Sequence, residues 1–301
     1  MTEVKGLIDI LGENIVLLDE PMKNHTSFRV GGNADAMIQP STIEELKKAM
    51  EYIKEHNIPY YVMGNGSNII VGDKGFRGAI IKIFSRMCHV EVQGEFMDIK
   101  AGALMTVIAS KALENSLTGF EFASGIPGTF GGAVCMNAGA YGGEIKDILV
   151  SVNVLTKDGE VKTLNADELE LSYRHSIIPK EEYIVLSGRI KLKKGVYDNI
   201  KEEMSRLSAQ RREKQPLSYP SAGSTFKRPE GYFAGKLISD AGLKGYSCNG
   251  AEVSEKHAGF VINKGNATAS DIVEVIKHCQ ETVYKKFGVK LETEVKMIGE
   301  F

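Results

Sequence analysis

Two glycine-rich segments constrain the fold of this chain more than any other feature of its sequence. Eight of the 25 residues from 119 to 143 are glycine, against 32 glycines in all 301 residues. A second cluster, Gly64-Asn65-Gly66-Ser67-Asn68, directly follows a run at 60–63 that is typical of a buried strand. Glycine has no Cβ and reaches positive φ at little cost, so such loops let backbone N–H groups surround a phosphate. Each loop taken alone could equally be a tight turn.

Neither glycine-rich segment fits a common nucleotide-binding motif. G-x-G-x-x-G between a strand and a helix is missing from both, and G-x-x-x-x-G-K-[ST] does not occur. The 37 Lys and Arg against 39 Asp and Glu give a net charge of −2, so the chain has no general attraction to nucleic acid or an anionic membrane. We therefore expect a pyrophosphate held locally by loops of another kind, and no nucleic-acid partner.

The sequence also argues against secretion, membrane insertion and metal binding. The first residues have neither the basic start nor the apolar run of a signal peptide, and no stretch could span a bilayer. The four cysteines form no C-x-x-C pair, and no two of the six histidines have metal-ligand spacing. We expect a cytoplasmic protein without a metal site or a membrane segment; the sequence specifies no oligomeric state.

Strands and helices are predicted to mix without a regular βαβ rhythm, which indicates an α+β fold and not a doubly wound sheet. The length favours two domains. Ser41 and Glu44 form a capping-box pattern at one helix start. Ser270 is the expected N-cap of the last helix, which Gly288 ends. The predicted helices cover 41–56, 105–117, 197–213, 232–241 and 271–287. The predicted strands cover 60–63, 79–83, 90–92, 96–101, 183–192, 260–263 and 289–298, with a hairpin over 150–163 that turns at Asp158-Gly159.

Several longer motifs follow one another along nearly the whole chain. They are Asn24-His25-Thr26-Ser27-Phe28-Arg29-Val30-Gly31-Gly32, the loop 64–68, Ser124-Gly125-Ile126-Pro127-Gly128-Thr129, Gly131-Gly132-Ala133, Asn137-Ala138-Gly139-Ala140-Tyr141-Gly142, Ser172-Tyr173-Arg174-His175-Ser176, Pro220-Ser221-Ala222-Gly223-Ser224-Thr225-Phe226 and Leu291-Glu292-Thr293-Glu294-Val295. In this order and spacing they resemble the UDP-N-acetylenolpyruvoylglucosamine reductases, also called UDP-N-acetylmuramate dehydrogenases. Several independent motifs together are far more specific than any one of them.

The resemblance implies an FAD-binding domain of the vanillyl-alcohol oxidase type, made of two α+β subdomains, and a smaller α+β substrate-binding domain. We place the FAD domain at 1–199, with subdomains of about 1–88 and 89–199, and the substrate domain at 200–301. Members reduce the enolpyruvyl ether of a UDP-sugar with NADPH, a cytoplasmic step of peptidoglycan synthesis. The implied contacts to non-covalent FAD are Gly64, Asn65, Gly66, Ser67, Asn68, Ser124, Gly125, Ile126, Pro127, Gly128, Thr129, Gly132, Gly139 and Arg211.

The implied chemistry explains the residue types at the remaining motif positions. A hydride passes from NADPH through the flavin to the enolpyruvyl group, and negative charge spreads into the substrate carboxylate. Arg174 suits that charge because a guanidinium grips a carboxylate with two N–H groups and stays protonated. Glu294 helps only if it donates a hydrogen bond, and Ser224 matches the family's proton donor. The UDP pyrophosphate and the sugar would be bound by Tyr173, Lys214 and Arg228.

Each of these residues also has a simpler interpretation. Arg174 could be a surface ion-pair arginine, Glu294 could face solvent from a strand, and Ser224 could cap a turn. The run from Arg211 to Lys214 could be a solvated helix end. Two other functions stay open as well: another FAD-dependent oxidoreductase of the same fold, and a flavin-binding module without turnover.

The family has a longer form, in which an additional loop folds a tyrosine over the active site, and a shorter form without that loop. The segment 231–288 leaves no room for the additional loop. The chain therefore resembles the shorter form, in which the residue that covers the uridine is unassigned.

Overall fold

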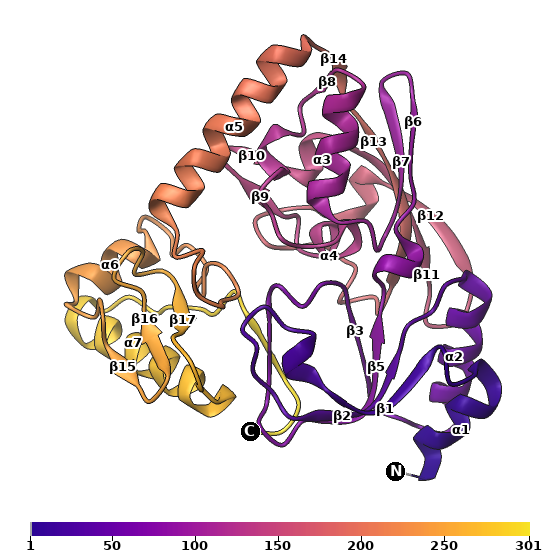
Figure 1. Ribbon diagram of the computed structural model, residues 1–301, viewed down its shortest axis with the longest axis horizontal. Coiled ribbons are helices and arrows are strands. Elements are labelled where there is room, and N and C mark those ends of the chain that lie inside the picture. Colours follow the sequence, from indigo (N-terminus) through magenta and orange to yellow (C-terminus); the bar gives the residue numbers. More distant parts are fainter. Residues whose placement is uncertain (1) are drawn as a thin grey trace. The chain divides into compact units, whose positions relative to one another are not determined.

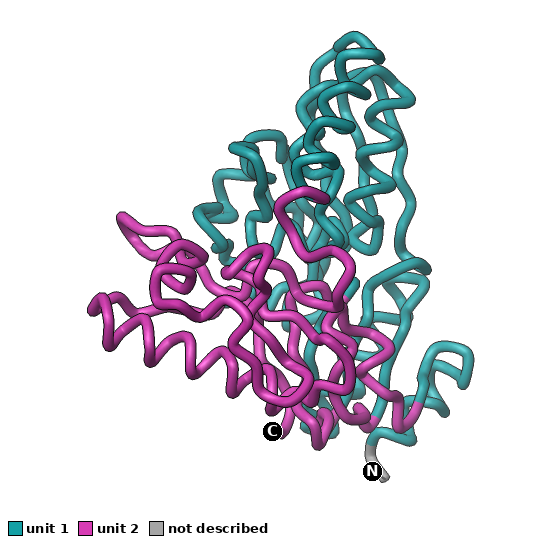
Figure 2. The backbone as a smooth tube through the Cα atoms, turned by 60° about the vertical axis from the view of Figure 1, so that its left-hand side comes forward, with its two compact units in different colours: residues 1–17, 36–65, 79–211 teal, residues 18–35, 66–78, 212–301 magenta. Residues whose placement is uncertain are grey.

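A computed structural model describes residues 2–301, which form two compact units (Figures 1 and 2). Unit 1 comprises the chain up to residue 17 together with 36–65 and 79–211, and unit 2 comprises 18–35, 66–78 and 212–301. These units alternate along the chain, whereas the sequence analysis placed contiguous domains on either side of 199–200. The domain boundary at 199–200 stays a prediction.

The five-stranded sheet of unit 1 is antiparallel and has one apolar face. Its order is β12 (Val161–Asn165), β11 (Leu149–Leu155), β13 (Ile184–Lys191), β7 (Phe96–Lys100), β6 (Val90–Gln93). Helix α4 (Phe130–Cys135) packs against β13 and β7. This close packing requires Gly188, because a Cβ there would lie 2.8 Å from the Phe130 ring. The sheet thereby holds the glycine-rich segment before α4 in place.

The remaining elements lie wholly or partly in unit 1, because four of them run across a boundary between the two units. Strand β3 (Tyr60–Met63) pairs in parallel with β5 (Phe76–Lys82), within a sheet of order β1-β2-β5-β3 that also contains β1 (Val16–Pro21) and β2 (Asn33–Ile38). The other elements are α1 (Thr2–Leu11), α2 (Ile43–Glu55), α3 (Met105–Glu114), α5 (Tyr197–Lys214), the pair β8 (Leu117–Thr118) and β14 (Lys193–Lys194), the pair β9 (Gly139–Ala140) and β10 (Gly143–Glu144), and the 3-10 helices η2 (Ser85–Met87), η3 (Glu121–Ala123), η4 (Ile145–Asp147) and η5 (Ala166–Leu169).

Unit 2 is built on a three-stranded sheet that α7 (Ala269–Phe287) contacts. The sheet order is β15 (Ser247–Cys248), β16 (Ala251–Val253), β17 (Val261–Asn263), and α6 (Ala234–Asp240) packs against α7. Strand β4 (Ile69–Val71) pairs in parallel with β18 (Lys296–Ile298), and η1 (Met22–Asn24) precedes the segment around Phe28. Phe28 and Ile70 share one apolar core with residues of α7. The mixture of helices and strands confirms the predicted α+β class.

Both predicted helix caps lie elsewhere in the structure. Thr42, not Ser41, caps α2: its Oγ1 accepts the Glu45 N–H at 3.1 Å, and the Glu45 carboxylate accepts the Thr42 N–H at 3.3 Å. Thr268, not Ser270, caps α7 with Asp271. Gly288 ends α7 at φ 69°, as predicted.

Two strand predictions are wrong in part. The segment 289–298 forms a regular strand only at Lys296–Ile298. Residues 289–295 make a single isolated β-bridge, between Thr293 and Phe226, and not a continuous ladder. Strand β3 is half-buried apart from Met63, although the sequence indicated a buried strand. The hairpin prediction is confirmed, since β11 and β12 pair from Ser151–Asn165 to Leu155–Val161 around Gly159.

Candidate active site

The glycine-rich segment that ends at Thr129 meets Gly64 and Asn65 in unit 1. The Asn65 Nδ2 donates to the Pro127 C=O at 2.6 Å. A Cβ on Gly64 would collide with the Thr129 Oγ1, and that oxygen accepts the Gly132 N–H at 3.4 Å as the N-cap of α4. The structure therefore brings these predicted flavin contacts into one backbone cradle that has no room for larger residues.

Arg211, near the end of α5, lies against the same cradle. Its Nη1 donates to the Gly125 C=O, and a Cβ on Gly125 would lie 2.9 Å from that nitrogen. Burial lowers the pKa of the Arg211 guanidinium, which nevertheless stays protonated near neutral pH. Among the described residues no carboxylate forms an ion pair with Arg211. A half-buried cation beside a glycine-rich loop is suited to an anionic or carbonyl-rich ligand.

The second half of the 64–68 loop belongs to unit 2, where Asn68 is its most constrained member. The Asn68 Nδ2 donates to the Glu294 C=O at 3.1 Å, and the Asn68 C=O accepts the Lys296 N–H at 3.0 Å. Gly66 has φ 65° and accepts the Ser27 N–H at 3.1 Å. Within unit 2 this loop is therefore fixed to the segment that carries the predicted catalytic glutamate.

Arg174 lies at the centre of a tight turn in unit 1. Ser172 and His175 bridge across the turn, and Arg174 has φ 54°, in the left-handed region that non-glycine residues rarely adopt. Its Nη2 donates to the Gly139 C=O at 3.4 Å, and its guanidinium lies 5.0 Å from the Tyr173 ring centroid. Strained backbone of this kind often occurs where function requires one side-chain direction.

Asn137 holds this turn, and the sequence analysis gave it no role. It is fully buried, its Nδ2 donates to the Ser172 C=O at 3.1 Å, and its Oδ1 accepts the Lys146 N–H at 2.9 Å. It also donates to Glu144 at 3.0 Å, whose pKa is lowered chiefly by Lys146 and further by Asn137 and Arg174. The signal in the sequence was a polar residue inside a glycine-rich motif, and its partner lies 35 residues further along the chain.

Ser224 and Glu294 lie on facing segments of unit 2. The Glu294 N–H donates to the C=O of Thr225, the residue after Ser224, at 2.8 Å. Ser224 is exposed and follows Gly223, which has φ 74°. Glu294 is only 9% exposed, so its simpler interpretation as a solvent-facing strand residue is wrong.

The three residues predicted to bind the UDP-sugar are all at least partly accessible. Tyr173 is 45% exposed and neighbours Arg174, and Lys214 is the exposed last residue of α5. The Arg228 guanidinium lies 4.0 Å from the ring centroid of Phe233, which is 59% exposed.

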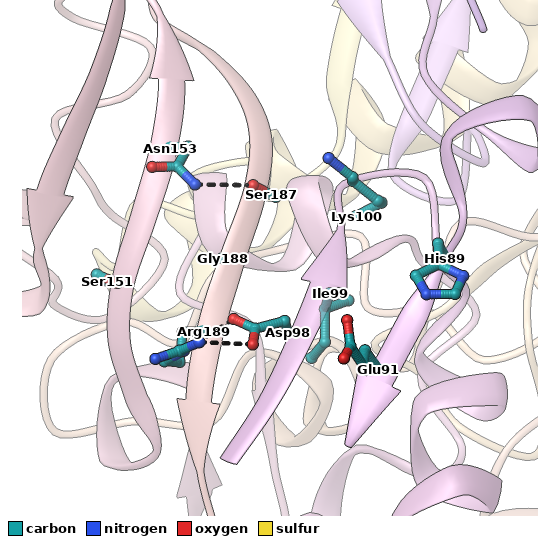
Figure 3. Close-up of a pocket in the computed structure, with 10 residues that line it drawn as sticks. All are labelled: His89, Glu91, Asp98, Ile99, Lys100, Ser151, Asn153, Ser187, Gly188 and Arg189. Atoms are coloured by element: carbon teal, nitrogen blue, oxygen red, sulfur yellow. Dashed lines mark hydrogen bonds and ion pairs between the residues drawn. The ribbon is translucent and has the colours of Figure 1, made fainter. Parts of the chain in front are cut away.

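A polar cavity of about 390 Å³ lies on the other face of the five-stranded sheet (Figure 3). Asp98 accepts two hydrogen bonds from Arg189, at 2.8 and 2.7 Å, which lower the pKa of that carboxyl. None of the predicted site residues lines this cavity, so it is separate from the cradle. Within residues 2–301 no cluster of side chains could hold a metal ion, and no helix is long and apolar enough to cross a membrane.

Comparison with known proteins shows that the likeness extends over the full chain. Two family models match: FAD binding domain over 34–165, and UDP-N-acetylenolpyruvoylglucosamine reductase, C-terminal domain, over 215–298. The UDP-N-acetylenolpyruvoylglucosamine reductase of Agathobacter rectalis is 56% identical, with 100% of this chain and 99% of that protein covered.

Solved structures give the same result. The reductase structure from Thermus caldophilus is 35% identical with a TM-score of 0.82, and the match covers 94% of this chain and 98% of that chain. A structure of p-cresol methylhydroxylase is 15% identical with a TM-score of 0.51, covering 97% of this chain and 65% of that chain, which shows a shared fold alone. The predicted FAD-binding fold with a following second domain is confirmed.

Proposed function

Because this chain belongs to the family of UDP-N-acetylenolpyruvoylglucosamine reductases, we propose that it reduces UDP-N-acetylglucosamine enolpyruvate to UDP-N-acetylmuramate with FAD and NADPH. The reaction saturates the carbon–carbon double bond of an enolpyruvyl ether during synthesis of peptidoglycan precursors. NADPH and nucleotide sugars are both cytoplasmic metabolites, which supports a cytoplasmic location.

One geometric observation carries the proposal within this chain: a buried carboxyl and an exposed hydroxyl occupy facing segments. Glu294 is bonded through its N–H to the residue that follows Ser224. Reduction of the double bond leaves negative charge beside the substrate carboxylate and requires a proton on carbon. A charge-stabilising group and a proton donor are the two residue types that this chemistry needs.

The cradle fits FAD held without a covalent bond. Gly64 and Gly125 allow the close approach of Thr129 and Arg211, glycine-rich loops can present backbone N–H groups to a phosphate, and Arg211 supplies a partly desolvated cation. When bound, FAD transfers the hydride of NADPH to the enolpyruvyl double bond. We assign the contacts to Gly64, Asn65, Gly66, Ser67, Asn68, Ser124 to Thr129, Gly132, Gly139 and Arg211.

The remaining site residues bind and polarise the substrate. We assign Arg174 to the substrate carboxylate, because a planar guanidinium donates two parallel hydrogen bonds to it. Glu294, in its protonated form, would donate a further hydrogen bond to the developing charge. Ser224 would give its proton to the carbon; serine is a weak acid, so this requires a strongly basic carbanion and fixed geometry. The UDP pyrophosphate and sugar are assigned to Tyr173, Lys214 and Arg228.

A spectrophotometric assay tests the proposal against its two alternatives. Purified holoprotein should consume NADPH when UDP-N-acetylglucosamine enolpyruvate is added, and much more slowly without it. A yellow protein that never oxidises NADPH with this enol ether would be a flavin-binding module. Turnover of an alcohol or lactone in its place would indicate another oxidoreductase of the same fold.

A further inference from the structure

Thr225 has no assigned role, although it lies directly beside Ser224 and opposite Glu294. We propose that Thr225 is a positioning residue: its side chain fixes the Ser224 hydroxyl relative to the Glu294 carboxyl for proton delivery. This inference rests on the proposed function, because it takes Ser224 and Glu294 as the proton donor and the charge-stabilising group.

Every polar group of Thr225 is hydrogen-bonded. Its N–H donates to the Gly259 C=O at 2.9 Å, and its C=O accepts the Glu294 N–H at 2.8 Å. Its Oγ1 accepts the Val261 N–H at 3.0 Å, in a buried bond. The residue is 1% exposed. Thr225 is therefore held to β17 by its side chain and to the Glu294 segment by its backbone.

Ser224 depends on this anchor because little else holds it. Among the described residues no hydrogen bond of the Ser224 hydroxyl is present, and its side chain is exposed. The preceding Gly223 has a left-handed backbone conformation, and glycine restrains the direction of the chain only weakly. The direction of the Ser224 side chain is thus set by the peptide that follows it. That peptide is held in two ways: the Thr225 N–H donates to the Gly259 C=O, and the Thr225 side chain accepts the Val261 N–H, which is the bond that Thr225→Val removes.

Glu294 is anchored on its other side by a different residue. The Asn68 Nδ2 donates to the Glu294 C=O, while the Glu294 N–H reaches Thr225. Loss of the Thr225 anchor would therefore move Ser224 while Asn68 still restrains Glu294. A general acid needs its donor about 2.6–3.2 Å from the receiving atom, and a displacement of about 1 Å can cost about 10²-fold in rate.

Stopped-flow measurements on the flavin-loaded enzyme separate this role from a general structural one. Thr225→Val keeps the shape but removes the oxygen that accepts the Val261 N–H, whereas Thr225→Ser keeps that oxygen. In Thr225→Val we expect flavin reduction by NADPH and the substrate KM to be unchanged. Reoxidation by the enolpyruvyl substrate should slow by about 10²-fold with a larger solvent deuterium isotope effect. Thr225→Ser should recover most of the rate.

A matched control is Thr268→Val, which also removes a threonine oxygen that accepts a backbone N–H in unit 2, at the start of α7. It should leave both half-reactions unchanged. If Thr225→Val does not fold, Thr225→Cys decides the question, because a thiol is a weaker acceptor of similar size. Its rate of flavin reoxidation should be lower than that of Thr225→Ser.

The outcomes separate the two proposals. If the substrate does not reoxidise the reduced flavin of the wild-type holoenzyme, the proposed function itself is wrong. Normal reoxidation in wild type and in every Thr225 variant, or equal slowing of both half-reactions in Thr225→Val, would overturn the role of Thr225 alone.

Discussion

Replacing Asn137 by alanine should lower the free energy of unfolding by about 3 kcal/mol. Asn137 is fully buried and its amide bonds to the Ser172 C=O, the Lys146 N–H and the Glu144 carboxylate. Glu144 keeps its ion pair with Lys146 when the amide is removed, so the cost comes from the two bonds to backbone groups. Both bonds are only part-buried, so each unsatisfied group should cost about 1 kcal/mol, at the low end of the usual range. The third contribution to the loss of stability comes from the backbone. Asn137 has φ 42°, and at this φ alanine lowers the free energy of unfolding by about 1 kcal/mol relative to asparagine or glycine.

Asn137→Gly isolates the backbone contribution, because it loses the same hydrogen bonds without the strain. Denaturant unfolding followed by circular dichroism should give Asn137→Gly a free energy of unfolding about 1 kcal/mol higher than that of Asn137→Ala. Both variants should also slow turnover, because the turn that carries Arg174 loses its bond to Asn137. A loss below about 1 kcal/mol in Asn137→Ala, or a glycine variant less stable than the alanine variant, would refute this account of the turn.

Further outcomes follow from the assigned site and from thiol burial. FAD should leave the protein intact on treatment with acid or heat, whereas flavin retained after denaturation would contradict non-covalent binding. Arg174→Lys should keep the fold and the flavin but slow reoxidation by substrate, since lysine lacks the planar fork; normal reoxidation in stopped flow would exclude Arg174. Ser224→Ala should leave flavin reduction unchanged and slow reoxidation by more than the roughly 10²–10⁴-fold typical of a general acid, with Ser224→Cys partly active. Equal slowing of both steps would make Ser224 a turn residue. Burial raises the pKa of the Cys135 thiol to about 12, so mildly alkaline iodoacetamide should alkylate exposed Cys88 and spare Cys135, which peptide mass spectrometry would check.

Local sequence patterns predicted α2, α3, α5, α6, α7 and the hairpin, but neither α1 nor α4 nor the choice between competing caps. Both Ser41 and Thr42 precede an acidic residue at the capping-box spacing, and nothing local decides between them. At α7 the deciding contact is distant: the Asp73 carboxylate accepts the Ser270 N–H at 2.9 Å across 197 residues. Ser270 therefore lies inside the helix, and Thr268 takes the cap.

The site shows the same limit of local patterns. The motifs around Arg174, Ser224 and Glu294 could be identified from the sequence because they resemble a known family, but their supports could not. Asn137 and Thr225 are short polar residues inside motifs, and each is distinguished only by partners far along the chain. Burial and satisfied hydrogen bonds, which the fold alone creates, separate such residues from ordinary turn residues.

Asn68 illustrates why a mutation in the glycine-rich loop would be hard to interpret from flavin content alone. Its amide is bonded to the Glu294 C=O and its carbonyl to the Lys296 N–H, and the pairing continues as the parallel strands β4 and β18. A side chain already engaged with the Glu294 segment acts on that segment whether or not it also touches FAD. Loss of flavin in Asn68→Ala would thus not by itself assign Asn68 to the cofactor, because the same change releases the backbone of Glu294. Half-reactions measured on protein reloaded with FAD would separate the two effects. Slow reoxidation at full flavin occupancy would show that the mutation acts through the position of Glu294.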